Sequence, residues 1–304
     1  MPVSRGAIAD TVLQLVGHTP LVRLAKVGPV GCASVVGKLE VKNPGGSVKD
    51  RPALAMIEEA EKRGQIGSGA VVVEATSGNT GISLAMISAV RGYRCILVMP
   101  EDMSLERRYV LRAYGAEIVL TPAEEGMTGA VLRAEEIARK TAGAFMPHQF
   151  DNAANPAAHE RTTAREIVAD AGDQLVAFVA GVGTGGTVTG VGRVLKRERP
   201  NVRIVAVEPA ASAVLSGHPA GMHGIQGLGA GFIPEILDGS VIDEVITVTD
   251  VAAERMTKRL AREEGLLLGP SSGANVHVAC EVASRFPGGV VVTVLCDTGE
   301  RYLF

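Results

Sequence analysis

The feature that most constrains the fold of this chain is a regular alternation between short β-branched runs and longer segments with helical periodicity. We predict strands at residues 35–41, 71–75, 95–99, 176–180, 203–208, 245–248 and 291–296. Between them we predict helices at residues 50–63, 79–91, 105–114, 157–170, 187–197, 251–264 and 273–286. Such alternation is typical of parallel sheets that carry helices on both faces. The 304 residues therefore predict an α/β protein with two three-layer domains built on mostly parallel, twisted sheets.

The alternation breaks near residues 143–155, beside Pro147 and Pro156. We accordingly predict an N-terminal domain at residues 1–149 and a C-terminal domain at residues 150–304. In doubly wound folds, ligands bind at the carboxyl ends of strands. The loops that follow the predicted strands are therefore the expected place for a functional site.

Composition excludes several classes of partner. The chain has 30 Lys+Arg against 33 Asp+Glu, 3% aromatic residues and no Trp, so neither a nucleic-acid footprint nor a membrane-interface belt is expected. No apolar stretch reaches the roughly 20 residues that span a bilayer, and the first residues do not resemble a signal peptide. The four Cys and six His show no metal-binding spacing. We expect a cytoplasmic protein that binds small molecules and no metal.

The first loop with recognisable chemistry is NPGGSVKDR at residues 43–51. Ser47 and Asp50 have the spacing of a capping box, which predicts that Lys49 lies in the first turn of a helix. A cation there meets the positive end of the helix dipole, so the neutral amine is favoured. A neutral amine is the form that a Schiff-base lysine requires. The alternative is an ordinary surface lysine.

The second loop, TSGNTG at residues 76–81, lies between a predicted strand and a predicted helix. Its backbone N–H groups, hydroxyls and amide suit one small anion, such as a carboxylate. An ordinary turn in which Ser77 or Asn79 caps the helix is the other interpretation.

The third loop, GVGTGGT at residues 181–187, precedes a predicted helix. Its glycines allow backbone amides to close around a phosphate at the helix N-terminus, and its threonines add donors. The same stretch matches GxGxxG, and the acid Glu208 follows it by about 20 residues, as in dinucleotide-binding domains. An NAD-dependent oxidoreductase is therefore a second functional hypothesis.

The fourth loop leads to Pro270 and the serines Ser271 and Ser272. Either serine could simply cap the helix that follows.

Taken together and in order, SVKDR, TSGNTG, GTGGT and PSSG resemble the cysteine synthase (O-acetylserine sulfhydrylase) family of fold-type II pyridoxal phosphate enzymes. The resemblance spans nearly the whole chain and includes QF at 149–150 and GLGAGFIP at 227–234. It implies a fold like that of the tryptophan synthase β subunit.

The resemblance also implies roles for individual residues. Lys49 would form the Schiff base with pyridoxal 5′-phosphate, Asn79 would bind its 3′-oxygen, and Ser271 would meet its pyridine nitrogen. The cofactor phosphate would be held by Gly183, Thr184, Gly185, Gly186 and Thr187. The substrate carboxylate would be held by Thr76, Ser77, Thr80 and Gln149.

The implied reaction is elimination of acetate from O-acetyl-L-serine, with Lys49 as general base, to give an aminoacrylate. Sulfide then adds and yields L-cysteine. Cystathionine β-synthases share the four loops but usually carry Tyr-Asp where this chain has Ala230-Gly231. Their reaction is kept as an alternative, and thiosulfate remains open as a sulfur donor.

The resemblance further implies a movable part within about 75–140 that closes over the substrate, and an N-terminal segment that crosses to the other domain. It implies a homodimer and allows a complex with serine acetyltransferase.

Overall fold

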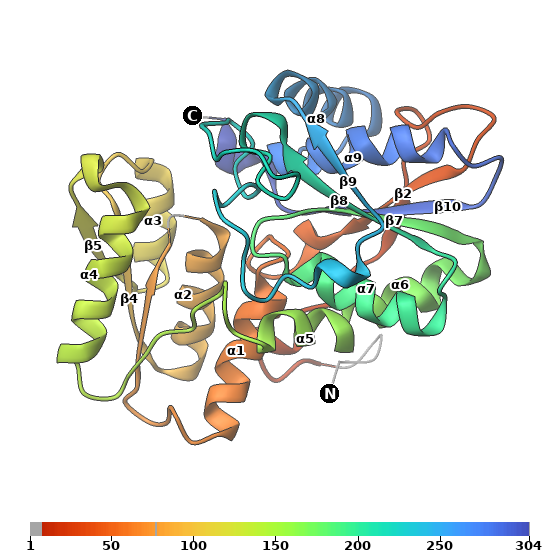
Figure 1. Ribbon diagram of the computed structural model, residues 1–304. Coiled ribbons are helices and arrows are strands. Elements are labelled where there is room, and N and C mark those ends of the chain that lie inside the picture. The colour runs from red at the N-terminus through yellow and green to blue at the C-terminus, as the bar shows by residue number, and fades with distance from the viewer. Residues whose placement is uncertain (1–7, 77, 304) are drawn as a thin grey trace. The chain divides into compact units, whose positions relative to one another are not determined.

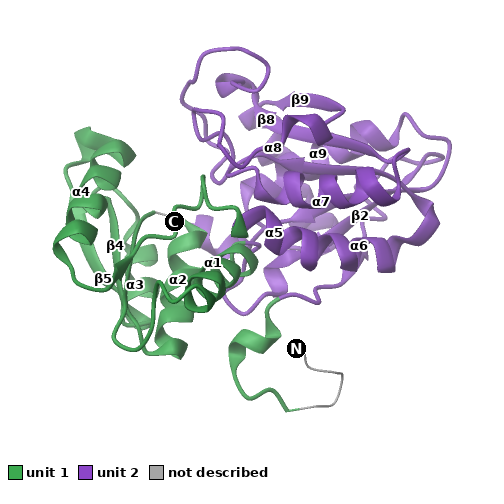
Figure 2. Ribbon diagram, turned by 60° about the horizontal axis from the view of Figure 1, so that its bottom comes forward, with its two compact units in different colours: residues 1–16, 49–154 green, residues 17–48, 155–304 purple. Residues whose placement is uncertain are grey.

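The computed structural model describes residues 8–76 and 78–303, and the chain forms two compact units (Figures 1 and 2). Unit 1 comprises residues 1–16 and 49–154, and unit 2 comprises residues 17–48 and 155–304. Among the described residues, no helix has the length and apolar character needed to cross a membrane.

Unit 1 is built on a parallel sheet with the order β5-β4-β3-β6. Its strands are β3 (Val71–Ala75), β4 (Arg94–Pro100), β5 (Glu117–Thr121) and β6 (Ala144–Phe145). Side chains alternate along β3: Val72 packs on one face with α1 (Asp50–Lys62), α2 (Asn79–Arg91) and α3 (Leu105–Ala113). Val71 and Val73 pack on the other face with α4 (Gly126–Lys140). The sheet is thus buried between two layers of helices (Figure 1).

Unit 2 contains a six-stranded sheet with the order β1-β2-β10-β7-β8-β9, in which β1 is antiparallel to β2 and the other pairs are parallel. Its strands are β1 (Leu21–Arg23), β2 (Ser34–Leu39), β7 (Leu175–Gly181), β8 (Arg203–Pro209), β9 (Glu244–Val248) and β10 (Val290–Leu295). Phe178 of β7 packs with α6 (Thr163–Ala171) and α7 (Gly186–Glu198). Val179 packs on the opposite face with α8 (Asp250–Glu264) and α9 (Pro270–Ala283).

The predicted fold class is confirmed, and each predicted element except the helix at 157–170 has one counterpart. The strands β1, β5 and β6 and the helix α4 were not predicted. The single helix predicted at 157–170 is wrong, because the structure has α5 (Ala154–Arg161) and α6 there. Thr162 between them has non-helical angles of φ −121° and ψ −75°, and its hydroxyl donates to the Ala158 carbonyl at 2.7 Å. Such bonding by a threonine competes with helix continuation.

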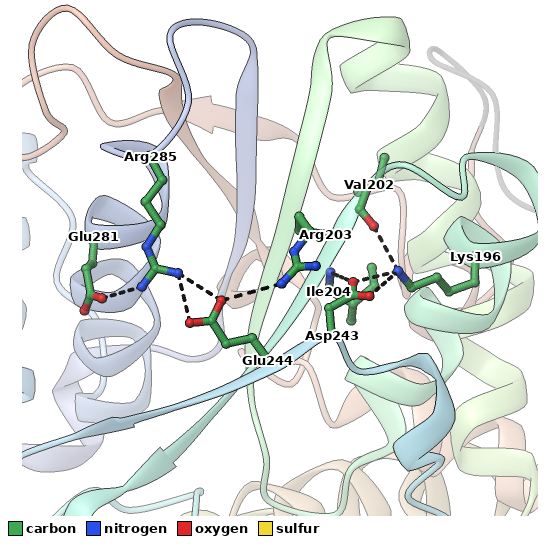
Figure 3. Close-up of polar contacts among 8 residues, drawn as sticks. All are labelled: Lys196, Val202, Arg203, Ile204, Asp243, Glu244, Glu281 and Arg285. Carbon is green, nitrogen blue, oxygen red and sulfur yellow. Dashed lines mark hydrogen bonds and ion pairs between the residues drawn. The ribbon is translucent and has the colours of Figure 1, made fainter.

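A polar network fixes the amino ends of β8 and β9 (Figure 3). Asp243, just before β9, accepts hydrogen bonds from Lys196 Nζ of α7 at 2.6 and 2.8 Å and from the backbone N–H of Ile204 at 2.7 Å. The next residue, Glu244, accepts from Arg285 at 2.9 Å. This network lies at the opposite ends of the strands from the loops where a site is expected.

Candidate active site

The loop after β7 forms a tight cradle at the N-terminus of α7. Gly185 has φ +81°, a conformation that favours glycine. A Cβ atom on Gly183 would lie 2.3 Å from the carbonyl oxygen of Gly227, and one on Gly186 would lie 1.9 Å from Oδ1 of Asn155. The loop therefore has no room for side chains at these glycines. It leads into the N-terminus of α7, where the helix dipole favours an anion.

Two residues of α5 hold the threonines of this cradle. Asn155 Nδ2 donates to Thr184 Oγ1 at 3.0 Å, and a ring nitrogen of His159 lies 3.2 Å from Thr187 Oγ1. Asn155 and His159 are four residues apart, so they project from the same side of the helix. Sequence reasoning missed both of them. Their spacing could not indicate a shared face, because the helix predicted from the sequence begins at residue 157 and leaves out Asn155, whereas α5 begins at Ala154.

Ser271 lies buried in the first turn of α9, beside the same cradle. A Cβ on Gly227 would lie 3.8 Å from Ser271 Oγ, and Gly227 is also the residue whose carbonyl contacts Gly183. Gly227 therefore adjoins both the cradle and Ser271. The alternative in which a serine caps α9 is wrong, because Gly269 is the N-cap residue.

The N-cap position predicted for Ser47 is also wrong. Helix α1 begins at Asp50, and Lys49 occupies the N-cap position without a side-chain cap. The reason is that Ser47 forms a β-bridge with Asp297, which keeps the chain before Lys49 out of the helix. Lys49 is half-buried, and its carbonyl accepts from the N–H of Ala53 at 3.0 Å. Lys49 still lies at the positive end of a helix dipole, as expected.

Cys296, which follows β10, joins the segments next to Lys49 and Ser271. Its carbonyl accepts from the N–H of Val48 at 2.8 Å, and its own N–H donates to Ser272 Oγ at 2.8 Å. The residue before Lys49 and the residue after Ser271 thus share one partner. This link was not predicted, because it joins parts of the chain that are far apart in sequence.

In unit 1, the residues predicted to bind a carboxylate lie around the start of α2. Thr80 Oγ1 donates to Gln149 Oε1 at 2.7 Å, and both side chains are buried. Thr76 Oγ1 accepts from the N–H of Gly78, the N-cap residue, at 3.3 Å. Asn79 is the first residue of α2, so it does not cap that helix. Ser77 lies outside the described residues.

Glu208, the acidic residue of the dinucleotide-binding pattern, has its carboxylate bound to backbone N–H groups of a neighbouring turn. It is 1% exposed, and its carboxylate accepts from the N–H groups of Leu215 and Ser216 at 2.8 and 3.0 Å. The carboxylate therefore stabilises the turn at residues 212–217. This arrangement does not favour the oxidoreductase hypothesis, in which the acid binds a ribose.

Comparison with known proteins gives consistent results. A family model described as "Pyridoxal-phosphate dependent enzyme" matches residues 12–297. A cysteine synthase of Staphylococcus aureus (strain Mu50 / ATCC 700699) is 53% identical over 296 residues, which cover 97% of this chain and 95% of that protein. The solved structure of an O-ureido-L-serine synthase matches with a TM-score of 0.95 and 48% identity, covering 98% of this chain and 94% of that one. A cysteine synthase from Entamoeba histolytica matches with a TM-score of 0.95 and 39% identity, covering 100% and 91%.

Proposed function

The chain belongs to the pyridoxal-phosphate dependent enzyme family, and from this premise we propose that it makes L-cysteine from O-acetyl-L-serine and sulfide by β-replacement. The observation that carries the proposal is the 53% identity, over 97% of the chain, to a cysteine synthase. The predicted family and the predicted cofactor, pyridoxal 5′-phosphate, are confirmed by the same comparisons.

The residues of unit 2 fit a phosphorylated cofactor. The cradle at 183–187 has no room for side chains at Gly183 and Gly186, and it presents the N-terminus of α7. We assign the phosphate to Gly183, Thr184, Gly185, Gly186 and Thr187. We assign Ser271, a neutral donor or acceptor beside Gly227, to the pyridine nitrogen.

The remaining assignments concern the substrate and the proton. The cofactor, when bound, withdraws electrons from the carbon atoms of the amino acid. Lys49 binds the cofactor covalently, and its freed amine removes the α-proton and later returns it. Asn79 binds the 3′-oxygen. The substrate carboxylate is held by Thr76, Ser77, Thr80 and Gln149.

We also propose that a movable part within residues 75–140, in a domain that ends near residue 149, closes over the substrate and excludes water. The N-terminal segment is divided, since residues 17–48 belong to unit 2. Hydrogen exchange with and without O-acetylserine tests this proposal. Exchange that slows at residues 75–140 is expected, and unchanged exchange there would contradict closure.

We further propose a cytoplasmic homodimer that also binds a serine acetyltransferase. The four cysteines are free thiols, which suits a reducing compartment. Light scattering tests the dimer, and a pull-down with an acetyltransferase C-terminal peptide tests the complex. A monomeric mass would contradict the homodimer, and a pull-down without bound protein would contradict the acetyltransferase complex.

The proposed reaction is tested by product analysis of the purified protein with O-acetyl-L-serine and either sulfide, thiosulfate or homocysteine. We expect cysteine as the main product with sulfide, and little cystathionine from homocysteine. Cystathionine formed at a higher kcat/KM than cysteine would favour the cystathionine β-synthase alternative. Formation of neither product would contradict β-replacement.

A further inference from the structure

A buried carboxyl group lies close in sequence to the residues that we assign to the substrate carboxylate. Glu74 occupies β3 two residues before Thr76, and it is only 6% exposed. Its Oε2 accepts a hydrogen bond from the backbone N–H of His148 at 3.1 Å. The mechanism proposed above gives Glu74 no role, and the sequence motifs do not indicate one.

The partner of Glu74 is an unusual turn. His148 has φ +51°, a left-handed conformation that is uncommon for residues other than glycine and costs free energy. Within the turn, the N–H groups of Asp151 and Asn152 both donate to the His148 carbonyl at 3.0 Å. The N–H group of His148, in turn, donates to the Glu74 carboxyl group. Both polar groups of the His148 backbone are therefore held.

The turn determines where the next side chain lies. Gln149 follows His148 directly, and its Oε1 accepts from Thr80 Oγ1 at 2.7 Å. Thr80 belongs to α2, whereas Gln149 belongs to the segment after β6, so the turn at His148 sets their approach. If His148 returned to a right-handed conformation, the direction of the chain at Gln149 would change.

The electrostatic state of Glu74 suits this position. Burial raises the pKa of Glu74 to about 8, although the N–H groups of His148 and Ala75 act against it, and the nearby Asp151 carboxylate adds to the rise. The Cys95 thiol on the neighbouring strand has a pKa raised to about 12 by burial, so it stays neutral. Glu74 is therefore protonated at neutral pH and does not repel an anion bound nearby.

We propose that Glu74 is a positioning residue for the amino-acid substrate, because it holds the left-handed turn at His148 and thereby keeps Gln149 against Thr80. The proposal rests on the proposed function, in which Thr80 and Gln149 bind the substrate carboxylate. Glu74 itself touches neither substrate nor cofactor in this scheme. It acts on substrate affinity rather than on the chemical step.

The test is a titration of the holoenzyme with O-acetyl-L-serine in the absence of sulfide, followed by the visible spectrum of the cofactor. In Glu74→Leu, the O-acetylserine concentration for half-conversion should rise about ten-fold, equal to about 1.4 kcal/mol, with an unchanged final spectrum. In Glu74→Gln, which keeps the acceptor and is neutral, it should stay within about two-fold of the wild type. Glu117→Leu, an exposed carboxylate of β5 paired with Arg94, is the matched control and should have no effect.

Two further variants keep Glu74 and change only the turn. His148→Val should raise the half-conversion concentration as Glu74→Leu does, because a β-branched residue disfavours a left-handed conformation. His148→Gly should leave the half-conversion concentration unchanged, because glycine adopts a left-handed conformation freely. These variants decide the matter if Glu74→Leu fails to fold.

The outcomes separate this inference from the proposed function. If the wild type shows no spectral response to O-acetylserine, the proposed function fails. If the wild type responds but Glu74→Leu or His148→Val responds at the same concentration, the positioning role is wrong. An equal loss in Glu74→Gln and Glu74→Leu would also contradict it, because the neutral amide keeps the acceptor.

Discussion

In the proposed mechanism Lys49 has the largest share of the chemistry, and this role is a prediction from the sequence motif SVKDR. Its surroundings could not be assigned in the same way. The β-bridge of Ser47 with Asp297 shifts the start of α1 and makes Lys49 the N-cap residue. A local motif such as Ser-x-x-Asp indicates a cap only where no distant strand competes for the same backbone. Here Asp297, two residues after the end of β10, pairs with that backbone.

We predict that Lys49→Ala lowers turnover by about a thousand-fold or more, because the general base is lost. The cofactor should still bind, held by its phosphate, but borohydride reduction should no longer attach it covalently. Activity assays and mass spectrometry of the reduced protein check both points. Lys42→Ala, an exposed lysine of the same region, is the control and should keep full activity. Full activity of Lys49→Ala would refute the assignment.

We predict that Ser271→Asp slows elimination of acetate by about ten-fold or more. A buried carboxylate beside the pyridine nitrogen would stabilise its protonated form, which a neutral serine does not do. Stopped-flow absorption after mixing with O-acetylserine measures this step, and circular dichroism checks that the variant is folded. An unchanged rate in a folded variant would mean that the partner of the ring nitrogen lies elsewhere.

At the scale of elements, the loop between β7 and α7 is the part of the proposed site that the sequence indicates most directly. Its glycines indicated a phosphate cradle from sequence, and the contacts of Gly183 and Gly186 explain why side chains are excluded. The contacts from α5 to Thr184 and Thr187 could not be predicted, because they require the packing of α5 against α7. Periodicity gives the elements but does not give these contacts.

We predict that Gly186→Ala weakens cofactor binding by about ten-fold or more, because its Cβ would lie 1.9 Å from Asn155 Oδ1. Alanine favours helices more than glycine does, so lost helix propensity would not explain the effect. Equilibrium titration of the apoprotein with pyridoxal phosphate measures it. Gly239→Ala, where a Cβ meets nothing within 4 Å, is the control. Equal affinities in the two variants would contradict the cradle.

We predict that Asp243→Asn, in the network of Figure 3, lowers the free energy of unfolding by about 2 kcal/mol at pH 7. Activity should not change. Burial raises the pKa of the Asp243 carboxyl, but hydrogen bonds from Lys196 and the Ile204 N–H lower it more, so this pKa lies below that of an ordinary aspartate. The ionised form therefore stabilises the fold above pH 3.8, and this contribution is lost as the pH falls through the folded-state pKa.

Urea unfolding of Asp243→Asn and wild type at several pH values checks the prediction, and the difference should shrink below pH 4. Glu254→Gln, which removes an exposed pair with Lys258 on α8, should change stability far less. If Asp243→Asn lowers the free energy of unfolding equally at every pH, the negative charge of Asp243 does not contribute to stability.

At the scale of the whole molecule, the α/β class, the parallel sheets and the order of the four loops all followed from the sequence. The antiparallel strand β1, the short strand β6 and the break at Thr162 did not follow, because short elements carry too few residues for a clear period. The loops to which the proposed function assigns roles belong to both units: Lys49 and residues 76–80 to unit 1, and the cradle and Ser271 to unit 2. Their joint use by one reaction is the central claim.

The visible absorption spectrum of the purified protein, before and after addition of O-acetyl-L-serine without sulfide, tests that claim most directly. We predict a band in the violet region that borohydride abolishes, as expected for a cofactor linked to a lysine. Addition of O-acetylserine should replace it with a band at longer wavelength, and sulfide should restore it. A colourless protein that instead changes the absorption of a nicotinamide dinucleotide would contradict the account and make the loop at 181–187 a dinucleotide site.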